Sequence, residues 1–271
     1  MRILVLTVVV CAAHASWAKT ARAAEAIDGL YDAVAPELAA GKPLVVEVQV
    51  ALCDNGIIAC GGRGLGDGDD LARNLYWATD GGLRGWFERR GSPWRRVART
   101  GRDGDVLETV VYEQRFAPRG AWARRGVKAP FVVRVAAHGW RGRAIDGALD
   151  RFVHDLFADD GDARVVAYVG HNGWMDRQTL IWPKRGATPV RGFVAVACLT
   201  RDYLQRALSS PTRVPLLLTR DLLFAGSHAL DGAITAFARG GSAADLRLAA
   251  SRAYADGERK PLARVQTLFT N

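Results

Sequence analysis

Continuous apolar runs constrain the fold of this 271-residue chain more than any other feature of its sequence. Five such runs are rich in the β-branched residues that favour strands. They lie at residues 43–54, 129–140, 163–170, 192–200 and 214–219. Runs that are apolar on both sides are typical of strands in a parallel sheet whose two faces are covered.

Segments with helical periodicity separate most of these runs. Residues 144–158 place one apolar stripe at helical spacing, formed by Ile145, Leu149, Phe152, Val153 and Leu156. Strands that alternate with helices of this length predict a single α/β domain over residues 43–271, with a mostly parallel sheet and helices on both faces. The later helices are expected at residues 201–208, 227–240 and 243–258.

The segment between the first two runs is less regular. We expect a helix over residues 70–90, with Asp69 or Asp70 as its N-cap and a break at its Gly-Gly pair. Two shorter strands follow, at residues 93–99 and 105–116, and a glycine-containing turn joins them.

The N-terminus has the pattern of a secretory signal peptide over residues 1–23. A basic start precedes an apolar stretch, and small residues follow at possible cleavage sites. The other interpretation of this stretch is a buried first strand. Residues 24–42 are then a short helix and a linker. We therefore expect an exported protein, periplasmic or extracellular, and no later run is long and apolar enough to span a membrane.

The formal net charge is +9, and most of the positive charge is arginine. A basic exported protein can bind an anionic envelope, polyanions or acidic substrates. The chain has no nucleic-acid-binding motif, and its arginines are scattered, so the charge indicates a solvated surface first and a binding face second.

The cysteine count isolates one thiol. Cys11 leaves with the signal peptide, so Cys53, Cys60 and Cys198 remain, and an odd number leaves one of them unpaired. If residues 55 and 56 form a hairpin turn, Cys53 and Cys60 are diagonal neighbours roughly 7–8 Å apart, at the limit of what a disulfide can bridge. A Cys53–Cys60 bond is therefore possible but not required, and in either case Cys198 is unpaired.

Two reactive side chains directly follow two of the apolar runs. His171 follows the run at 163–170, and Cys198 lies near the end of the run at 192–200. If the two strands are neighbours, both side chains emerge at the same edge of the sheet, where ligands of parallel sheets bind. A thiol needs a base to become a nucleophile, and an imidazole can supply it. The amides of Gly173 and Cys198 are candidate oxyanion donors.

These blocks carry a resemblance to a known family. The stretches YVGHNG and VAVAC resemble the histidine and cysteine blocks of the caspase-like cysteine peptidases, and CDN, Arg63-Gly64 and Asp69 resemble their first strand and Arg-Gly loop. The resemblance spans about residues 43–240 and implies a caspase-like α/β fold and a His171/Cys198 dyad. In caspases the loop arginine helps to bind an acidic side chain of the substrate.

By position alone, Arg63 and Asp54 are candidates for substrate binding. The stretch NLYWATDGG also resembles exported bacterial proteins of unassigned activity that share the LYW, GHxG and AC blocks. The chain departs from the caspase-like pattern at Asn172, which separates the histidine from Gly173, and it lacks the glutamine of the caspase QAC block.

Other residues offer weaker alternatives. His138 also ends an apolar run in a His-Gly pair, but a helix and a strand separate it from the cysteine strand. His154 and His228 lie in predicted helices and are interpreted as structural. The spacings of paired zinc ligands are absent, and GLGDGDD lacks the spacing of an EF-hand, so we predict no metal and no cofactor.

Three functions remain open on the sequence alone. The first is an exported cysteine peptidase that acts on a peptide or protein substrate. The alternative is a non-catalytic domain of the same fold that binds an envelope or protein partner through its basic surface. A polyanion-binding protein without a pocket is a third, weaker possibility.

Overall fold

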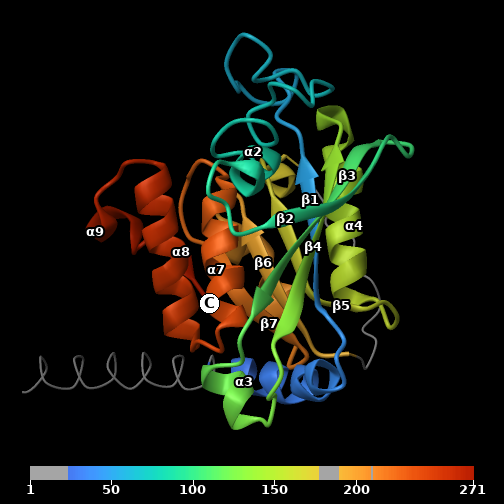
Figure 1. Ribbon diagram of the computed structural model, residues 1–271. Coiled ribbons are helices and arrows are strands. Elements are labelled where there is room, and N and C mark those ends of the chain that lie inside the picture. Colours follow the sequence, from blue (N-terminus) through green and yellow to red (C-terminus); the bar gives the residue numbers. More distant parts are fainter. Residues whose placement is uncertain (1–23, 177–188, 209) are drawn as a thin grey trace, which may run out of the picture.

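The computed structural model of the protein describes residues 24–176, 189–208 and 210–271, so the predicted signal peptide lies outside the described residues. Its core is one eight-stranded sheet in the order β2-β3-β4-β1-β5-β6-β7-β8 (Figure 1). In chain order the strands are Leu44–Ala51, Arg95–Thr100, Val106–Phe116, Phe131–Trp140, Ala163–Val169, Arg191–Val196, Arg213–Thr219 and Phe269–Thr270.

The predicted α/β architecture with a mostly parallel sheet is confirmed. β1 pairs in parallel with both β4 and β5, and β5, β6 and β7 continue the parallel order. Both edges are antiparallel, with the β2–β3 hairpin beside β4 and β8 beside β7. The strands β2, β3 and β4 lie on one side of β1, and β5 to β8 lie on its other side, so the order reverses at β1. A crevice for ligands is expected at such a reversal, outside the carboxyl ends of the strands.

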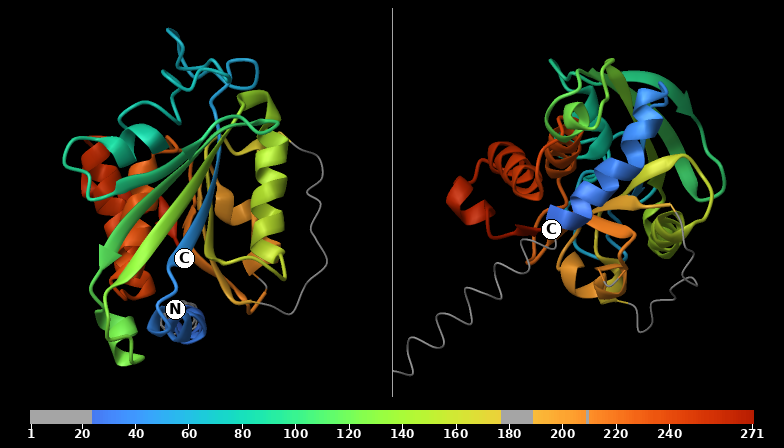
Figure 2. Two further views of the ribbon diagram at one scale, coloured as in Figure 1. Left: turned by 45° about the vertical axis from the view of Figure 1, so that its right-hand side comes forward. Right: turned by 90° about the horizontal axis from the view of Figure 1, so that it is seen from below.

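Helices cover both faces of the sheet (Figure 2). α4 lies on one face, and α7, α8 and the helix over residues 24–39 lie on the other. The longer helices are α4 (Ile145–Phe157), α7 (Ser227–Ala238) and α8 (Ala243–Gly257). The shorter ones are α2 (Leu83–Glu88), α3 (Gly120–Arg124), α5 (Thr200–Tyr203), α6 (Gln205–Leu208) and α9 (Leu262–Val265).

Side-chain alternation along the strands forms two separate cores. On β1, Val46, Val48 and Val50 face the core under α7 and α8, whereas Val45 and Ala51 face the core under α4. The predicted apolar stripe of α4 is buried along its whole length, from Ile145 to Leu156. The helix over residues 24–39 buries its own stripe in the larger core, formed by Ile27, Leu30, Tyr31, Val34, Ala35 and Leu38.

The predicted helix over residues 70–90 is wrong for most of its length. Residues 71–82 form successive turns, and only α2 is helical. The carboxamide of Asn74 explains the difference, because it accepts from the Cys53 amide (3.0 Å) and donates to the Cys53 and Asp67 carbonyls (2.8 and 2.9 Å). A side chain that bonds the backbone in this way competes with helical hydrogen bonds.

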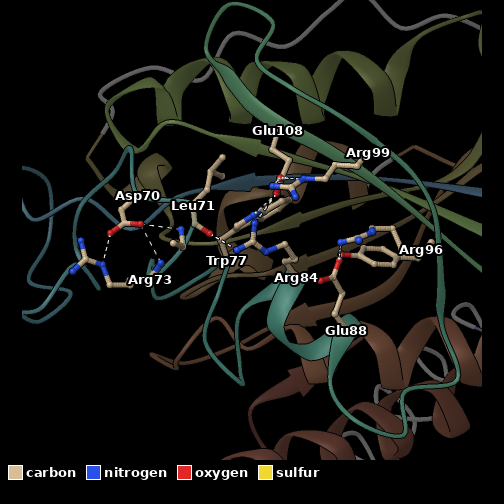
Figure 3. Close-up of polar contacts among 11 residues, drawn as sticks. Asp70, Leu71, Arg73, Trp77, Arg84, Glu88, Arg96, Arg99 and Glu108 are labelled. Atoms are coloured by element: carbon tan, nitrogen blue, oxygen red, sulfur yellow. Dashed lines mark hydrogen bonds and ion pairs between the residues drawn. The ribbon is translucent and has the colours of Figure 1, made fainter.

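A buried carboxylate fastens this irregular segment to the sheet (Figure 3). Glu108 of β3 is 2% exposed and accepts the indole N–H of Trp77 at 2.8 Å. It also pairs with Arg84 at 3.1 Å and with Arg99 of β2. Arg84 in turn donates to the carbonyl of Leu71 at 2.5 Å. One carboxylate therefore joins the turns, α2, β2 and β3.

The outer strand of the hairpin is exposed at every position. All six residues of β2 are exposed, and three of them are the arginines 95, 96 and 99. Arg96 pairs with Glu88 at 2.9 Å. Within the described residues, no helix combines the length and apolar character that crossing a bilayer requires.

Replacing Glu108 tests this anchoring role. Glu108→Ala leaves the guanidinium of Arg84, only 18% exposed, without its partner. Breaking one side of a buried ion pair costs about 3–5 kcal/mol, so the urea midpoint of unfolding should fall accordingly. The control is Glu113→Ala, which removes a partner of the exposed Arg134 and should cost about 1 kcal/mol or less. Equal losses in the two variants would contradict the anchoring role.

Candidate functional site

The two strands that carry His171 and Cys198 are neighbours. β5 and β6 pair in parallel, with Tyr168 opposite Ala195 and Val169 opposite Val196. Continued by two residues, this register sets position 171 opposite position 198. Both residues therefore leave the sheet at the carboxyl ends of its parallel strands. β5 lies directly beside β1, where the strand order reverses. The expected shared edge is observed, and it follows from the strand order.

Cys198 is the free cysteine of the described chain and is partly exposed. Cys53 and Cys60 are joined by a disulfide, with their Cα atoms 6.0 Å apart. The predicted turn at residues 55 and 56 is present, since the Ile57 amide donates to the Asp54 carbonyl at 2.9 Å. The residues on either side of it, 52–54 and 59–60, are not paired strands.

The chain turns sharply after Cys198. Leu199 adopts the left-handed region, with φ 54° and ψ 27°, and α5 begins at the next residue. This conformation is uncommon for a branched side chain, and surrounding contacts must hold it. Thr200 and Thr219 supply them, because each hydroxyl accepts from the other residue's amide, at 3.1 and 3.0 Å. The two hydroxyls also lie 2.9 Å apart.

The thiol and the imidazole have separate hydrogen-bond partners. His171 Nε2 lies 2.7 Å from the Asp176 carboxylate, and the Cys198 thiol donates to the Leu223 carbonyl at 3.5 Å. The described contacts include no hydrogen bond between the thiol and the ring. Asp176 therefore orients the ring. No motif in the sequence indicates this role, and its only signal is a carboxylate five residues after the histidine.

Asn172 fastens the end of β5 to Cys198. Its side chain is fully buried, donates to the Cys198 carbonyl and accepts from the Trp174 amide at 3.1 Å. Asn172, which separates His171 from Gly173, is thus a bridge between the two strand ends.

The amide assigned to the oxyanion site at Gly173 is already engaged. It donates to the His171 carbonyl at 3.0 Å. A Cβ at position 173 would lie 3.0 Å from Ile145 and Leu149 of α4, so the residue is pressed against that helix. The Gly173 amide is therefore not a free donor in this conformation, and its oxyanion role stays a prediction that needs this bond to open. The Cys198 amide remains as the candidate, since it has no acceptor among the described residues.

Asp54 and Arg63 line one cavity beyond the end of β1. The cavity has a volume of about 460 Å³, and Arg73 and Arg143 also line it, together with five glycines of the 61–68 loop. Arg63 takes a left-handed conformation, with φ 56°, and the Asp54 carboxylate accepts from the Gly56 amide at 2.8 Å. The two residues proposed from position alone therefore share one polar hollow.

Two buried tyrosines lie on the inner side of Cys198. Burial first, and the nearby Cys198 to a smaller extent, raise the pKa of Tyr76 to about 12. The pKa of Tyr254 is raised by burial first, then by the charge of Glu258, with a smaller contribution from Cys198. Both phenols therefore stay protonated at neutral pH, and the Tyr254 hydroxyl accepts from the Phe224 amide at 3.1 Å.

The remaining histidines lie outside this constellation. His138 bonds Glu47 at 2.7 Å and Thr109 at 2.9 Å on the face of the sheet. His154 is exposed on α4, and His228 is fully buried at the start of α7. Across the described ranges, no group of three or more histidine, cysteine or acidic side chains is placed to hold a metal ion.

Comparisons with protein-family models, with curated proteins and with solved structures returned no match for this chain.

Removal of the Asn172 bridge should destabilise the fold. Asn172→Ala leaves the Trp174 amide and the Cys198 carbonyl without their partner, and an unpaired buried polar group costs about 1–3 kcal/mol. Urea unfolding measures this loss. The matched control is Gln205→Ala, which removes an exposed side chain that donates to the Arg201 carbonyl of α5 and should change stability by about 0.5 kcal/mol or less. A neutral Asn172→Ala would disprove the bridging role.

Proposed function

We propose that the protein is an exported thiol hydrolase of the cysteine peptidase type, with Cys198 as nucleophile and His171 as base. The register between β5 and β6 carries this proposal, because it places both residues at the ends of adjacent parallel strands. The left-handed Leu199 supports it as well, since strained backbone in native structures gathers at functional sites.

The chemistry assigns one role to each side chain. His171 takes the thiol proton of Cys198, and the sulfur attacks the carbonyl carbon of a peptide bond. The protonated imidazole then donates that proton to the leaving amine, which leaves an acyl group on sulfur. A water molecule, deprotonated by His171, releases the acid and restores the thiol. Asp176 holds the ring through Nε2, which leaves Nδ1 to face the sulfur.

This proposal requires a local movement. The thiol must leave the Leu223 carbonyl and turn toward the ring before the dyad is complete. Catalytic hydrogen bonds often tighten only when substrate is bound, so the separate partners of the two side chains are compatible with a resting state. The cavity lined by Asp54 and Arg63 lies at the same edge of the sheet and offers a place for part of the substrate.

The separate hydrogen-bond partners of His171 and Cys198 favour a second function. Asp176 satisfies His171 and the Leu223 carbonyl accepts the Cys198 thiol, as in a site without catalysis. The protein would then be a non-catalytic exported domain that binds an anionic envelope or protein partner through its arginine-rich surface, consistent with its net charge of +9.

Alkylation of Cys198 separates these functions. With iodoacetamide, an activated thiol reacts well below the ordinary thiol pKa of about 8.5. Peptide mass spectrometry reads the modification at Cys198 apart from Cys11. At pH 6.5 we expect His171→Ala to slow the reaction by about 10-fold, which corresponds to one pKa unit of lost thiolate stabilisation, and Asp176→Asn to slow it less. The control is Asp202→Asn, an exposed carboxylate of α5, which should have no effect.

The activated dyad would be excluded if the alkylation rate of wild type followed the pH dependence of an ordinary thiol and stayed the same in His171→Ala. The binding function would then remain.

Hydrolysis itself is measured with a peptide library and the processed, oxidised protein. New peptide termini should appear with wild type and vanish with Cys198→Ala, whereas Asp202→Asn should cleave normally. Cleavage that persists in Cys198→Ala would show that another group, or a contaminant, is responsible.

A further inference from the structure

His228 is a buried imidazole in the first turn of α7 and is 0% exposed. Within the described part of the chain, neither Nδ1 nor Nε2 makes a hydrogen bond. Buried polar side chains in native proteins are nearly always paired, so each exception calls for an explanation.

The walls around the ring are tight and mostly apolar. A Cβ built at Gly226 would lie 2.0 Å from the His228 ring, and one built at Gly257 would lie 2.9 Å from it. The rings of Trp86 and Tyr254 pack against it with centroids 5.4 and 5.1 Å away. Backbone and aromatic carbon thus enclose the imidazole.

The charged groups near the ring come from two elements. Arg89 follows α2, where it pairs with Asp231 at 3.8 Å. Glu258 follows α8 and has its Oε1 3.5 Å from His228 Nε2, and Lys260 lies close to that carboxylate. Burial, and then the charge of Arg89, lower the pKa of His228 to about 4. Burial raises the pKa of Glu258. The ring is therefore neutral at pH 7.

A chain of contacts leads from this ring to the candidate nucleophile. Tyr254 packs on His228, and its hydroxyl accepts from the Phe224 amide at 3.1 Å. The preceding carbonyl, that of Leu223, accepts the Cys198 thiol at 3.5 Å. The segment 221–226 is thus held between the end of α8 and the thiol.

We propose that His228 is an acid-sensitive latch, whose protonation separates the end of α8 from the start of α7 and frees the segment 221–226 from Cys198. A charged imidazole cannot remain in this apolar enclosure without a large desolvation cost. It would also stand at the positive end of α7 and near Arg89, both of which oppose a cation. The Glu258 carboxylate, 3.5 Å from Nε2, favours the cation, but burial raises the pKa of Glu258, so this attraction weakens as the pH falls. The latch controls whether the Cys198 thiol is exposed. A role in regulating hydrolysis rests in addition on the proposed hydrolase function.

The direction of the pH dependence follows from the two states of the ring. The closed form keeps His228 neutral, and the open form lets it take a proton at its ordinary pKa of about 6.5. The closed form is thus fully favoured above pH 6.5 and loses that advantage as pH falls toward 4. Between pH 7 and pH 5 the opening equilibrium should rise about 20-fold.

Hydrogen-exchange mass spectrometry on the full oxidised protein tests the latch. After correction for intrinsic exchange rates, opening of residues 221–226 and 250–258 should rise about 20-fold from pH 7 to pH 5, while β1 stays protected. His228→Phe keeps an aromatic ring without a titrating nitrogen and should abolish the rise. The control is His154→Gln, which removes an exposed histidine and should keep it.

The same rise in His228→Phe, or a rise that includes β1, would overturn the latch. If His228→Phe does not fold, NMR titration of His228 in the wild type decides instead, and a folded-state pKa near 6.5 overturns the proposal. The pH-dependent opening should persist in Cys198→Ala. A protein that opens in this way but cleaves no peptide contradicts the hydrolase and leaves the latch intact.

Discussion

The parallel pairing of β1 with both β4 and β5 is the constraint on which the rest of the structure depends. It fixes where the order of strands reverses, and it brings the ends of β1, β5 and β6 to one edge. The disulfide-linked loop, the polar cavity, His171 and Cys198 all follow these strand ends. The disulfide-linked loop and the cavity belong to one stretch of the chain, whereas His171 and Cys198 lie far from it in sequence, so their placement at the same edge is a property of the sheet.

Two buried polar arrangements hold that edge in place. Glu108 fastens the turns at 71–82 to the sheet through Trp77 and Arg84, and Asn172 ties the end of β5 to Cys198. Buried groups of this kind stabilise only when every donor and acceptor is matched. His228 departs from that rule, because neither of its nitrogens makes a hydrogen bond among the described residues while its surroundings are closed. Glu108 and Asn172 therefore fasten the fold through matched hydrogen bonds, and His228 does not.

The sequence predicts the apolar strands and the stripe of α4 well, since both depend on local periodicity. It fails at residues 71–82, where Asn74 bonds Cys53 and thereby replaces a helix by turns. The neighbouring strands of His171 and Cys198 follow from the pattern of runs. That pattern does not predict three features of the site: Asp176 as the partner of the His171 ring, the engaged amide of Gly173, and the bridge made by Asn172. Each of these depends on the direction a side chain or an amide takes after the strand has ended, and no periodicity encodes that direction.

The exposed hairpin strand β2 has a consequence for how copies of the protein meet. An open edge strand offers unpaired backbone groups to any other chain that can extend the sheet. Here that edge carries arginines at 95, 96 and 99 within six residues. Two copies that joined edge to edge would bring these guanidinium groups together, and like charges on facing strands repel. Charged side chains on this strand thus oppose the addition of a second copy at the β2 edge.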